Sequence, residues 1–408
     1  MRIGIFSDMH LGPYGDRVLP SSGLNMRMMD YHYTLSHIMQ DMRKRKVDVC
    51  LFGGDAFKDK SGKPNPTQLK MFGSNIFPSG EQFFDIHMIP GNHDLPRAMG
   101  EADALACFEW LGGIHIHRTP ELFNWCFNDK VQIITLPYPN RNALMTMDSF
   151  KDMPVSEVNN AIGRMLAEKL KELASRLDPN IPSVLIAHLA LDVAKAGSEN
   201  QMMMGRDICL SMHEIPDNID YCFFGHIHKP QEIQRHGFAE GDAKGKVYII
   251  GSPESVDFGE EGDVKRWLLL DTDAGTVESI PTNSRRYFTF DIDYTESTYD
   301  DICTLLAYQG STGMRDGDIV RARIKMRKNQ QFPLAEFKQK LLNNGAFSVK
   351  IEREYIPEER DIQAVQTAEA QTQEDIFRQY CESKNITGSR ADRLVEAGLS
   401  VMAEMTGE

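Results

Sequence analysis

Short apolar runs recur along the first 230 residues, and each run ends in polar or glycine-containing residues. The runs lie at residues 3–6, 47–52, 87–90, 184–187 and 221–224. Continuous apolar runs bounded by turn residues are typical of strands that are buried on both faces. We therefore expect five buried strands, each carrying polar residues at its carboxyl end.

A different period appears between residues 159 and 177. Apolar residues there fall three or four positions apart, and charged residues fill most of the positions between them. This spacing predicts an amphipathic helix. Two further strands are expected at 246–250 and 267–271. Strands that alternate with helices predict a layered α/β fold in which helices cover sheets.

The pattern changes near residue 284, where we place a domain boundary. Beyond it, strand-like segments at 287–292, 319–324 and 348–351 alternate with helix-like segments at 299–307 and 333–342. This content is sufficient for one small α+β domain.

The end of the chain begins with a polar segment at 363–373, rich in Gln, Ala and Thr, which is typical of a linker or a solvated helix. Two short helices with apolar faces follow, the second beginning near Ser389. Their apolar residues are Ile376, Phe377, Tyr380, Leu394, Leu399 and Met402. The predicted parts are a domain at 1–284, a capping domain at 285–356, and a linker with a helical tail at 357–408.

Composition narrows the class of protein. Of the 408 residues, 41% are hydrophobic and 25% are charged, as in ordinary globular chains of two or three domains. The net charge of −14 repels polyanions, so nucleic-acid binding must be local or assisted by metal ions or a partner. Seven cysteines without a Cys-x-x-Cys pair favour reduced thiols. The chain starts without a signal-peptide pattern and holds no apolar run near the ~20 residues of a membrane helix, so we expect a cytoplasmic protein without membrane contact.

Seven potential metal ligands lie at the ends of the five predicted strands. They are Asp8, His10, Asp55, Asn92, His188, His226 and His228. A mixture of carboxylate, amide and imidazole ligands suits a transition-metal ion. Seven ligands are too many for one ion, but they suit two ions that share a bridging carboxylate.

Each motif alone has an ordinary explanation. Asp8-x-His10 could cap a turn, His188 could be a core histidine with satisfied hydrogen bonds, and a Gly-Asp pair is common in turns. Together these explanations fail, because five independent strand ends would each have acquired ligand-type residues by accident. The set therefore indicates a two-metal hydrolytic centre.

The order of these motifs resembles the calcineurin-like metallophosphoesterase superfamily: Asp-x-His, Gly-Asp, Gly-Asn-His-Asp, His and Gly-His-x-His. Residues 220–231, 251–253 and 257–261 narrow the resemblance to SbcD-type nucleases, which repair DNA double-strand breaks together with an SMC-like ATPase. The resemblance implies a four-layer α/β/β/α sandwich of mixed sheets with the metal centre at the strand ends, a small α+β capping domain and a C-terminal helical tail. It also implies metal-dependent exonuclease or endonuclease activity on DNA.

The family pattern divides the ligands between two ions. One ion would be held by Asp8, His10, Asp55 and His228. The other would be held by Asp55, Asn92, His188 and His226, with Asp55 as the bridge. Mn²⁺ is the expected metal, with Mg²⁺, Fe²⁺ and Co²⁺ as alternatives. The resemblance further implies DNA as a partner, an SMC-like coiled-coil ATPase bound through the tail, and a homodimer.

Three residues near the ligands have other predicted roles. His93 is not needed as a ligand, so we expect it to be the general acid that protonates the departing sugar oxygen. Asp94 either orients His93 or only caps the loop. Lys58 stands where relatives often have His or Asp, and it either contacts phosphate or is solvated.

Basic residues that could follow a nucleic-acid backbone are scattered, except at residues 321–327. The scattered ones are Arg17 and Arg27, in a long loop after His10, and Arg97, Arg141, Arg285 and Arg286. Arg321, Arg323, Lys325 and Arg327 alternate along a predicted strand and therefore share one face. That face is either a stripe that contacts DNA phosphates or the solvated side of an edge strand.

Two other functions stay open. The chain could be a metallophosphoesterase that acts on small nucleotides or phosphoproteins, although Asp94 stands where protein phosphatases normally have glutamate. Alternatively, it could be a non-catalytic scaffold at DNA ends. Scaffold members of the family lose metal ligands or the general acid, and in this sequence none of these residues is missing.

Overall fold

The fold is known from a computed structural model that describes residues 1–60, 62–77, 84–96, 100–125, 130–141, 150, 153–195, 207–307, 313–356, 373–384 and 386–406. These residues form two units, Met1–Phe288 with Gly317–Ile319, and Thr289–Asp316 with Val320–Glu408. Arg97 and the predicted linker as far as residue 372 lie outside the described residues. The domain limits at 284 and 356 stay predictions.

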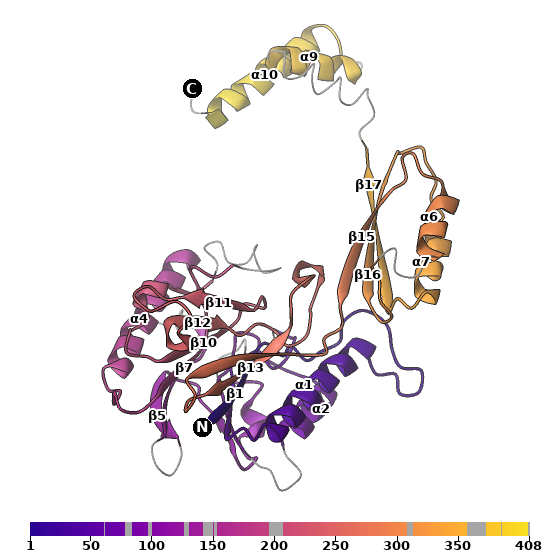
Figure 1. The fold of residues 1–408 in the computed structure, drawn as a ribbon. Helices are drawn as coiled ribbons and strands as arrows, with labels where there is room; N and C mark the ends of the chain where they lie inside the picture. Colours follow the sequence, from indigo (N-terminus) through magenta and orange to yellow (C-terminus); the bar gives the residue numbers. More distant parts are fainter. Residues whose placement is uncertain are drawn as a thin grey trace. The chain divides into compact units, whose positions relative to one another are not determined.

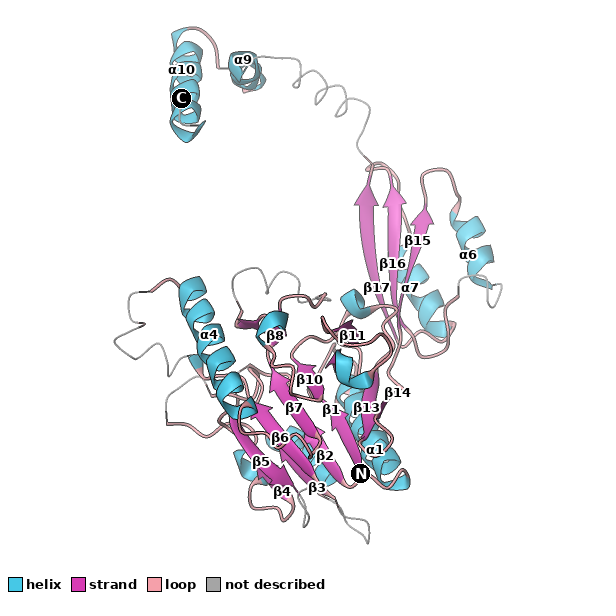
Figure 2. Cartoon of the chain, turned by 60° about the vertical axis from the view of Figure 1, so that its left-hand side comes forward, coloured by secondary structure: helices cyan, strands magenta, loops and turns pink. Residues whose placement is uncertain are grey.

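The first unit contains two six-stranded sheets, and the first of them has four parallel strands beside an antiparallel pair. Its order is β14 (Thr276–Pro281), β13 (Arg266–Asp271), β1 (Arg2–Phe6), β2 (Val49–Phe52), β3 (Asp85–Met88) and β4 (Ile114–Ile116). The predicted strands that belong to this sheet are therefore present. Because β1, β2 and β3 are parallel, their carboxyl ends lie at one edge of the sheet (Figure 2).

The second sheet also has four parallel strands, but they are central and an antiparallel strand lies at each edge. Its order is β11 (Gln231–Gln234), β12 (Lys246–Ile249), β10 (Tyr221–Gly225), β7 (Ser183–His188), β6 (Val131–Leu136) and β5 (Glu121–Trp125). A separate two-stranded sheet pairs β8 (Ala190–Leu191) with β9 (Cys209–Leu210). The runs predicted at 184–187 and 221–224 thus lie side by side as β7 and β10.

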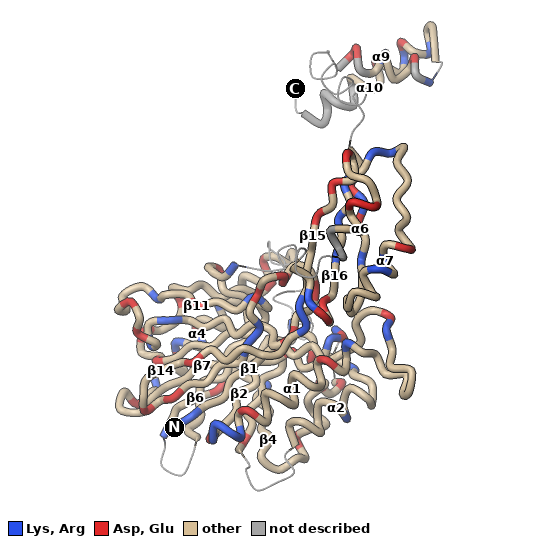
Figure 3. Tube along the Cα trace, turned by 45° about the vertical axis from the view of Figure 1, so that its right-hand side comes forward, with Lys and Arg blue, Asp and Glu red and all other residues tan. Residues whose placement is uncertain are grey.

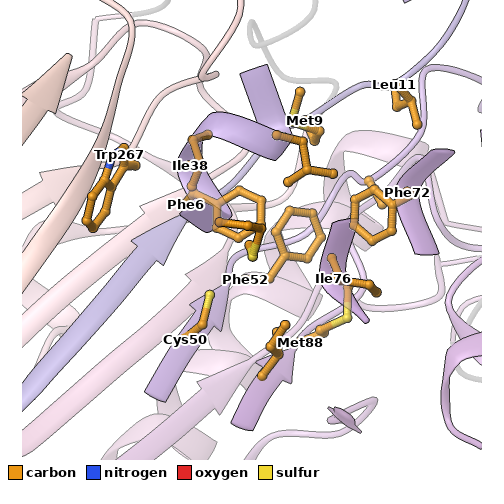
Figure 4. Close-up of a cluster of buried hydrophobic side chains, with 14 of the residues drawn as sticks. Phe6, Met9, Leu11, Ile38, Cys50, Phe52, Phe72, Ile76, Met88 and Trp267 are labelled. Carbon is orange, nitrogen blue, oxygen red and sulfur yellow. The ribbon is translucent and has the colours of Figure 1, made fainter. Parts of the chain in front are cut away.

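Helices cover the outer faces of both sheets (Figure 1). On the first sheet, α1 (Met26–Lys44) and α2 (Pro66–Ile76) pack over a cluster that includes Phe6, Phe52 and Phe72 (Figure 4). On the second sheet, α4 (Val155–Ala174) packs through a cluster that includes Leu166 and Leu185. Each sheet therefore has one face covered by helices.

The inner faces of the two sheets pack on each other. Ile3 and Ile5 of β1 contribute to this inter-sheet core together with Val184 and Phe223 of the second sheet. Side chains alternate between the faces of a strand, so Phe6 joins the helix-covered cluster instead. The layers are helix, sheet, sheet and helix, which confirms the predicted four-layer α/β/β/α sandwich.

The helix predicted at 159–177 is confirmed as α4, although it begins at Val155 because Val158 already packs in the core. Helix α1 was not predicted. Asn25 caps it by accepting a hydrogen bond from the Met28 N–H (3.0 Å). Arg27, assigned from the sequence to a loop, is therefore in the first turn of a helix.

The second unit contains a three-stranded sheet in the order β15 (Tyr287–Asp293), β16 (Ile319–Met326) and β17 (Ser348–Tyr355). Helices α6 (Tyr299–Ala307) and α7 (Leu334–Asn343) accompany this sheet. Ile302 of α6 and Phe337 of α7 share a hydrophobic core with Val320 and Ile324 of β16. The small α+β arrangement expected for this part of the chain is confirmed.

Arg321, Arg323 and Lys325 lie on one face of β16, as predicted, because the residues between them are buried. The fourth predicted residue, Arg327, lies beyond the end of the strand at Met326. However, β16 is the central strand of the sheet, so the edge-strand explanation is wrong. Arg323 pairs with Asp291 (2.7 Å), and Lys325 lies 4.0 Å from Asp293. Acidic and basic residues therefore mingle along β15 and β16 (Figure 3).

The tail forms the two predicted helices, α9 (Gln373–Ser383) and α10 (Ser389–Thr406). They pack on each other, since a methyl group added at Gly398 would lie 2.7 Å from the Phe377 ring. Arg378 of α9 also pairs with Asp392 of α10 (3.0 Å). Within the described ranges, no helix is both long enough and apolar enough to cross a membrane.

Three histidines gather around β3, β4 and β5. The buried ring of His87 stacks on His115 and Phe123, and its Nδ1 lies 2.8 Å from Nε2 of His117. Nε2 of His87 has no hydrogen-bond partner among the described residues. Burial, together with the imidazoles of His117 and His115, lowers the pKa of His87 to about 3. His87 is therefore neutral in the folded protein.

We predict that metal-free protein loses stability as the pH falls from about 6.5 to about 3. In this window the unfolded chain protonates His87 and the folded chain does not, so unfolding takes up a proton and becomes easier. The contribution of His87 is about 1.4 kcal/mol per pH unit. Denaturant unfolding at a series of pH values should give a flatter stability profile for His87→Phe than for wild type.

The exposed His236 offers a control, because His236→Phe should keep the wild-type slope. If the profiles of His87→Phe and wild type run parallel, the buried neutral imidazole is not a source of the pH dependence.

Candidate metal centre

The structure brings all seven sequence-predicted ligands together where the strands of both sheets end. Asp8 and His10 follow β1, Asp55 follows β2, and Asn92 follows β3 in the first sheet. His188 ends β7, while His226 and His228 follow β10 in the second sheet. In open α/β sheets, ligands bind beyond the carboxyl ends of parallel strands, because loops from neighbouring strands converge there.

The backbone at this edge is strained. Positive φ angles occur at Asp8 (53°), His10 (42°), Asp55 (57°) and His226 (86°), and among the described residues Lys46 is the one other non-glycine case. Such conformations cost about 1–3 kcal/mol each and persist where the surrounding structure enforces them. Here the His226 N–H donates to both Asp8 carboxylate oxygens (3.0 Å each), which ties the second sheet to the first. Strain concentrated in this way is typical of a functional site.

One ligand group consists of Asp8, His10 and His228. Nε2 of His10 lies 3.9 Å from the Asp8 carboxylate and 2.9 Å from Nε2 of His228. Burial, together with the nearby imidazoles of His93 and His228, holds the pKa of His10 well below its usual value. A neutral imidazole is the form that binds a metal ion.

Another candidate ligand group consists of Asp55, His188 and His226, with Asn92 beside them, and a third set of His10, Asp55 and His93 overlaps both. Nε2 of His188 lies 3.4 Å from Asp55 Oδ2 and 3.2 Å from Asn92 Oδ1, while Nδ1 of His226 lies 2.9 Å from the same amide oxygen. Burial opposes the protonation of His188, but the Asp55 and Asp8 carboxylates outweigh it and raise its pKa to about 9. This position therefore attracts positive charge.

Asp55 lies between the two groups. Its Oδ2 is 3.5 Å from Nε2 of His10 and 3.4 Å from Nε2 of His188, so one oxygen faces both groups. Its Oδ1 accepts a hydrogen bond from the His93 N–H (2.7 Å), which fixes the carboxylate in this orientation. A carboxylate oxygen placed in this way can be shared by two cations.

Three histidines of the centre have their other ring nitrogen held by an oxygen. Nδ1 of His188 lies 2.6 Å from the Gly53 carbonyl, Nδ1 of His228 lies 2.8 Å from Glu260, and Nε2 of His226 contacts Asp207. Such contacts determine which nitrogen faces the metal.

Glu260 and Asp207 were not assigned a role from the sequence. Glu260 lies within the residues 257–261 that carry the family resemblance, and this was the signal that could have found it. Burial favours a raised pKa for Glu260, but His228 and Lys265 outweigh it and lower the value to about 2. Asp207 has no comparable signal in the sequence.

His93 is oriented by a backbone carbonyl. Its Nδ1 lies 2.7 Å from the Lys58 oxygen, and because a carbonyl only accepts, Nδ1 carries the proton and Nε2 is left for other partners. The His93 ring packs edge-on against the His10 ring, with 4.6 Å between the ring centres. Both residues line a pocket of about 320 Å³. This placement is compatible with the predicted proton donor.

Within the described part of the chain, the Asp94 side chain forms no hydrogen bond with His93. Its carboxylate accepts three backbone N–H groups, from Asp55 (2.8 Å), Ala56 (3.0 Å) and Gly91 (3.0 Å). The orienting role for Asp94 is therefore wrong, since its lone pairs are directed at the backbone that carries Asp55. Asp94 is the loop cap of the alternative interpretation.

Several basic residues considered for DNA contact are engaged in other interactions. Lys58 donates to the Pro13 carbonyl (2.6 Å), and its Nζ lies 3.8 Å from the centre of the Tyr14 ring, so it is not simply solvated. The buried Arg27 pairs with Glu254 and Asp30, Arg285 pairs with Asp30, and Arg286 pairs with Asp318. For the buried Arg27 the DNA-contact interpretation is wrong, whereas Arg17, Arg141 and the partly exposed Arg285 and Arg286 stay candidates.

The donor atoms fit divalent cations. Two carboxylates that are at most 2% exposed lie among imidazoles and an amide oxygen, and buried charge of this kind needs a compensating cation. Only glycine fits at position 91 beside these donors, because a methyl group added there would lie 2.2 Å from Asp55 Oδ1.

Residues 1–230 match the calcineurin-like phosphoesterase family, and the chain belongs to this family of metallophosphoesterases.

Individual relatives show which members of the family the chain resembles. The chain is 24% identical over 312 residues to the SbcD subunit of nuclease SbcCD from Staphylococcus epidermidis, covering 74% of each chain. It is 23% identical over 289 residues to the same protein of Bacillus subtilis, covering 67% of each chain. It is also 23% identical over 290 residues to the DNA double-strand break repair protein Mre11 of Methanopyrus kandleri, covering 67% of this chain and 55% of that one. The resemblance to SbcD-type nucleases is therefore confirmed.

We predict that Asp94→Ala weakens metal binding and lowers thermal stability together. The change leaves three buried N–H groups without an acceptor, at a cost of about 1–3 kcal/mol each, and it releases the backbone that positions Asp55. Calorimetric titration with Mn²⁺ and thermal unfolding measure the two effects.

The exposed carboxylate of Asp217 supplies the control, and Asp217→Ala should behave as wild type. An Asp94→Ala protein with normal metal affinity and stability but reduced hydrolysis would return Asp94 to a role in proton transfer.

Proposed function

We propose that this chain hydrolyses phosphodiester bonds in DNA with two divalent metal ions, Mn²⁺ being the physiological metal. The observation that carries the proposal is the position of Asp55 Oδ2 between two ligand groups, in the pocket that His93 also lines. DNA is the proposed substrate because the relatives that the chain resembles are nucleases and a DNA repair protein. Divalent ions bound at the two groups supply positive charge that lowers the pKa of a water molecule and stabilises negative charge developing on the phosphate oxygens.

His93 supplies the proton for the leaving group. Its Nδ1–H is held by the Lys58 carbonyl, so the imidazolium form of His93 carries the transferable proton on Nε2 and becomes a neutral imidazole when it gives that proton up. The sugar oxygen needs that proton as its bond to phosphorus breaks, and a positioned general acid contributes about 10²–10⁴-fold to the rate. Asp94 acts at a distance by holding the Asp55 backbone.

A DNA-binding site on a chain with a net charge of −14 needs local positive charge. Lys58 and Lys60 both line the pocket, and both follow the bridging residue Asp55 in the chain. Asp55, Asp207 and Asp257 line the same pocket, so bound divalent cations would have to supply the positive charge that attracts a DNA strand there. Binding should consequently depend strongly on salt and on the bound cations.

The tail is the proposed attachment site for an SMC-like coiled-coil ATPase. A partner subunit is expected because the two relatives are each named as one subunit of the nuclease SbcCD. Tyr380 of α9 is 59% exposed and Leu394 of α10 is 45% exposed, although the two helices already pack on each other through Phe377 and Gly398. Exposed aromatic and aliphatic residues of this kind can serve as anchors in a partner's groove. Together with a second copy of the chain, such a complex would process DNA double-strand breaks in the cytoplasm.

The proposal is tested by assaying linear duplex DNA, hairpin DNA and bis-p-nitrophenyl phosphate with Mn²⁺, Mg²⁺, Co²⁺ or Fe²⁺ present. We predict metal-dependent cleavage of all three substrates, fastest with Mn²⁺. His93→Ala should lower the rates on the two DNA substrates by about 10²–10⁴-fold and slow the small diester less, because p-nitrophenolate leaves without taking up a proton. The variant should still bind two ions, since no ligand is removed.

His236→Ala, an exposed histidine in the same unit, serves as the control and should keep wild-type rates. Cleavage of the small diester alone would overturn DNA as the substrate and favour a small nucleotide or a phosphoprotein. If His93→Ala loses its metal ions in step with its activity, the residue is a ligand and the assignment of the acid is wrong.

A further inference from the structure

A fully buried lysine lies beside the metal centre. The Lys265 side chain has no exposed surface, and its Nζ contacts Glu260 Oε2 (2.7 Å), Ser252 Oγ (3.0 Å) and the His228 carbonyl (3.2 Å). The Asp263 carboxylate lies farther away, at 3.7 Å. A buried charge is costly unless it is paired and hydrogen-bonded, so these partners fix the position of the ammonium group.

Glu260 links this lysine to a metal ligand. It ends a short 3-10 turn, Phe258–Glu260, and is 1% exposed. Its Oε2 accepts the Val256 N–H (2.9 Å) as well as Lys265, and its Oε1 lies 2.8 Å from Nδ1 of His228. Both oxygens of the carboxylate are therefore constrained, and one of them is directed at the imidazole.

His228 is consequently held at two points by one ion pair. Glu260 holds its ring through Nδ1, and Lys265 holds its backbone through the carbonyl oxygen. An acceptor at Nδ1 keeps the proton on that nitrogen and leaves the Nε2 lone pair directed at His10 and the metal position.

We propose that the buried Glu260–Lys265 ion pair sets the affinity of one of the two metal positions, the one formed by Asp8, His10 and His228, by fixing the tautomer and orientation of His228. This inference rests on the two-ion centre proposed above. Glu260 and Lys265 are positioning residues, because they act through His228 and do not line the pocket.

The other metal position is supported differently. His226 contacts Asp207, and the Asp207 carboxylate accepts a hydrogen bond from the neutral Tyr138 hydroxyl (3.1 Å). Asp207 is also 12% exposed, whereas the Glu260 and Lys265 side chains are fully buried. Loss of the ion pair should therefore affect one Mn²⁺ binding step more than the other.

The decisive variant is Glu260→Met with Lys265→Met, which removes both charges and keeps a similar buried volume. Replacing a buried ion pair by well-packed apolar residues is often neutral for stability, whereas Lys265→Met alone leaves a buried carboxylate unpaired. The double variant should unfold at a higher temperature than Lys265→Met. Its Mn²⁺ titration should still show one of the two binding steps weakened by about 10–100-fold.

Nitrogen-15 NMR of the His228 imidazole supplies a second readout. Metal-free wild type should carry the proton on Nδ1, and the double variant should show a mixture of tautomers. The exposed neighbour Glu261 gives a matched control, since Glu261→Gln should keep both Mn²⁺ steps and the tautomer.

A stable double variant that binds two Mn²⁺ with wild-type affinities, with His228 still protonated on Nδ1, would overturn the proposal and leave the ion pair a purely structural role. Failure of wild-type protein to cleave DNA would count against the proposed function and leave this inference intact, because metal affinity and tautomer are measured without a substrate.

Discussion

The carboxylates of Asp8 and Asp55 are buried where the carboxyl ends of the strands of both sheets meet. The structure around them is arranged to compensate for this buried negative charge. Removing a carboxylate from water costs several kcal/mol unless hydrogen bonds or cations replace the lost hydration. Part of the replacement is internal, since the His226 N–H donates to Asp8 and the His93 N–H donates to Asp55. The histidines that face these oxygens complete a candidate donor set for divalent cations, and such cations would supply the remainder.

The centre requires both sheets at once. The first sheet contributes Asp8, His10, Asp55 and Asn92, and the second contributes His188, His226 and His228. Contacts across the two sheets, such as Nδ1 of His188 with the Gly53 carbonyl (2.6 Å), hold these two half-sites in register. The inter-sheet hydrophobic core beneath them therefore serves function as well as stability, because a shift of one sheet would separate the ligand groups.

Local chemistry explains which features could be predicted from the sequence. The buried strands and the ligands at their ends were predictable because apolar runs and the residues that follow them are short-range signals. Helix α1 was missed although Met28, Tyr31, Leu35, Ile38 and Met42 of its buried face fall three or four positions apart, so its apolar period was present in the sequence. The contacts that orient the ligands could not be predicted in the same way. The Lys58 carbonyl that holds His93 and the N–H groups that hold Asp94 belong to the backbone, which every residue shares.

The central proposal is that the Asp55 carboxylate would be shared by two metal ions. Anomalous scattering from crystals grown with Mn²⁺ tests it most directly, with wild type compared with Asp55→Asn and with Asn92→Ala. We expect two fully occupied positions in wild type, loss of Mn²⁺ from both positions in Asp55→Asn, and loss confined to the position beside His188 and His226 in Asn92→Ala. Two fully occupied positions in Asp55→Asn would contradict the shared carboxylate, and with it the account of this centre.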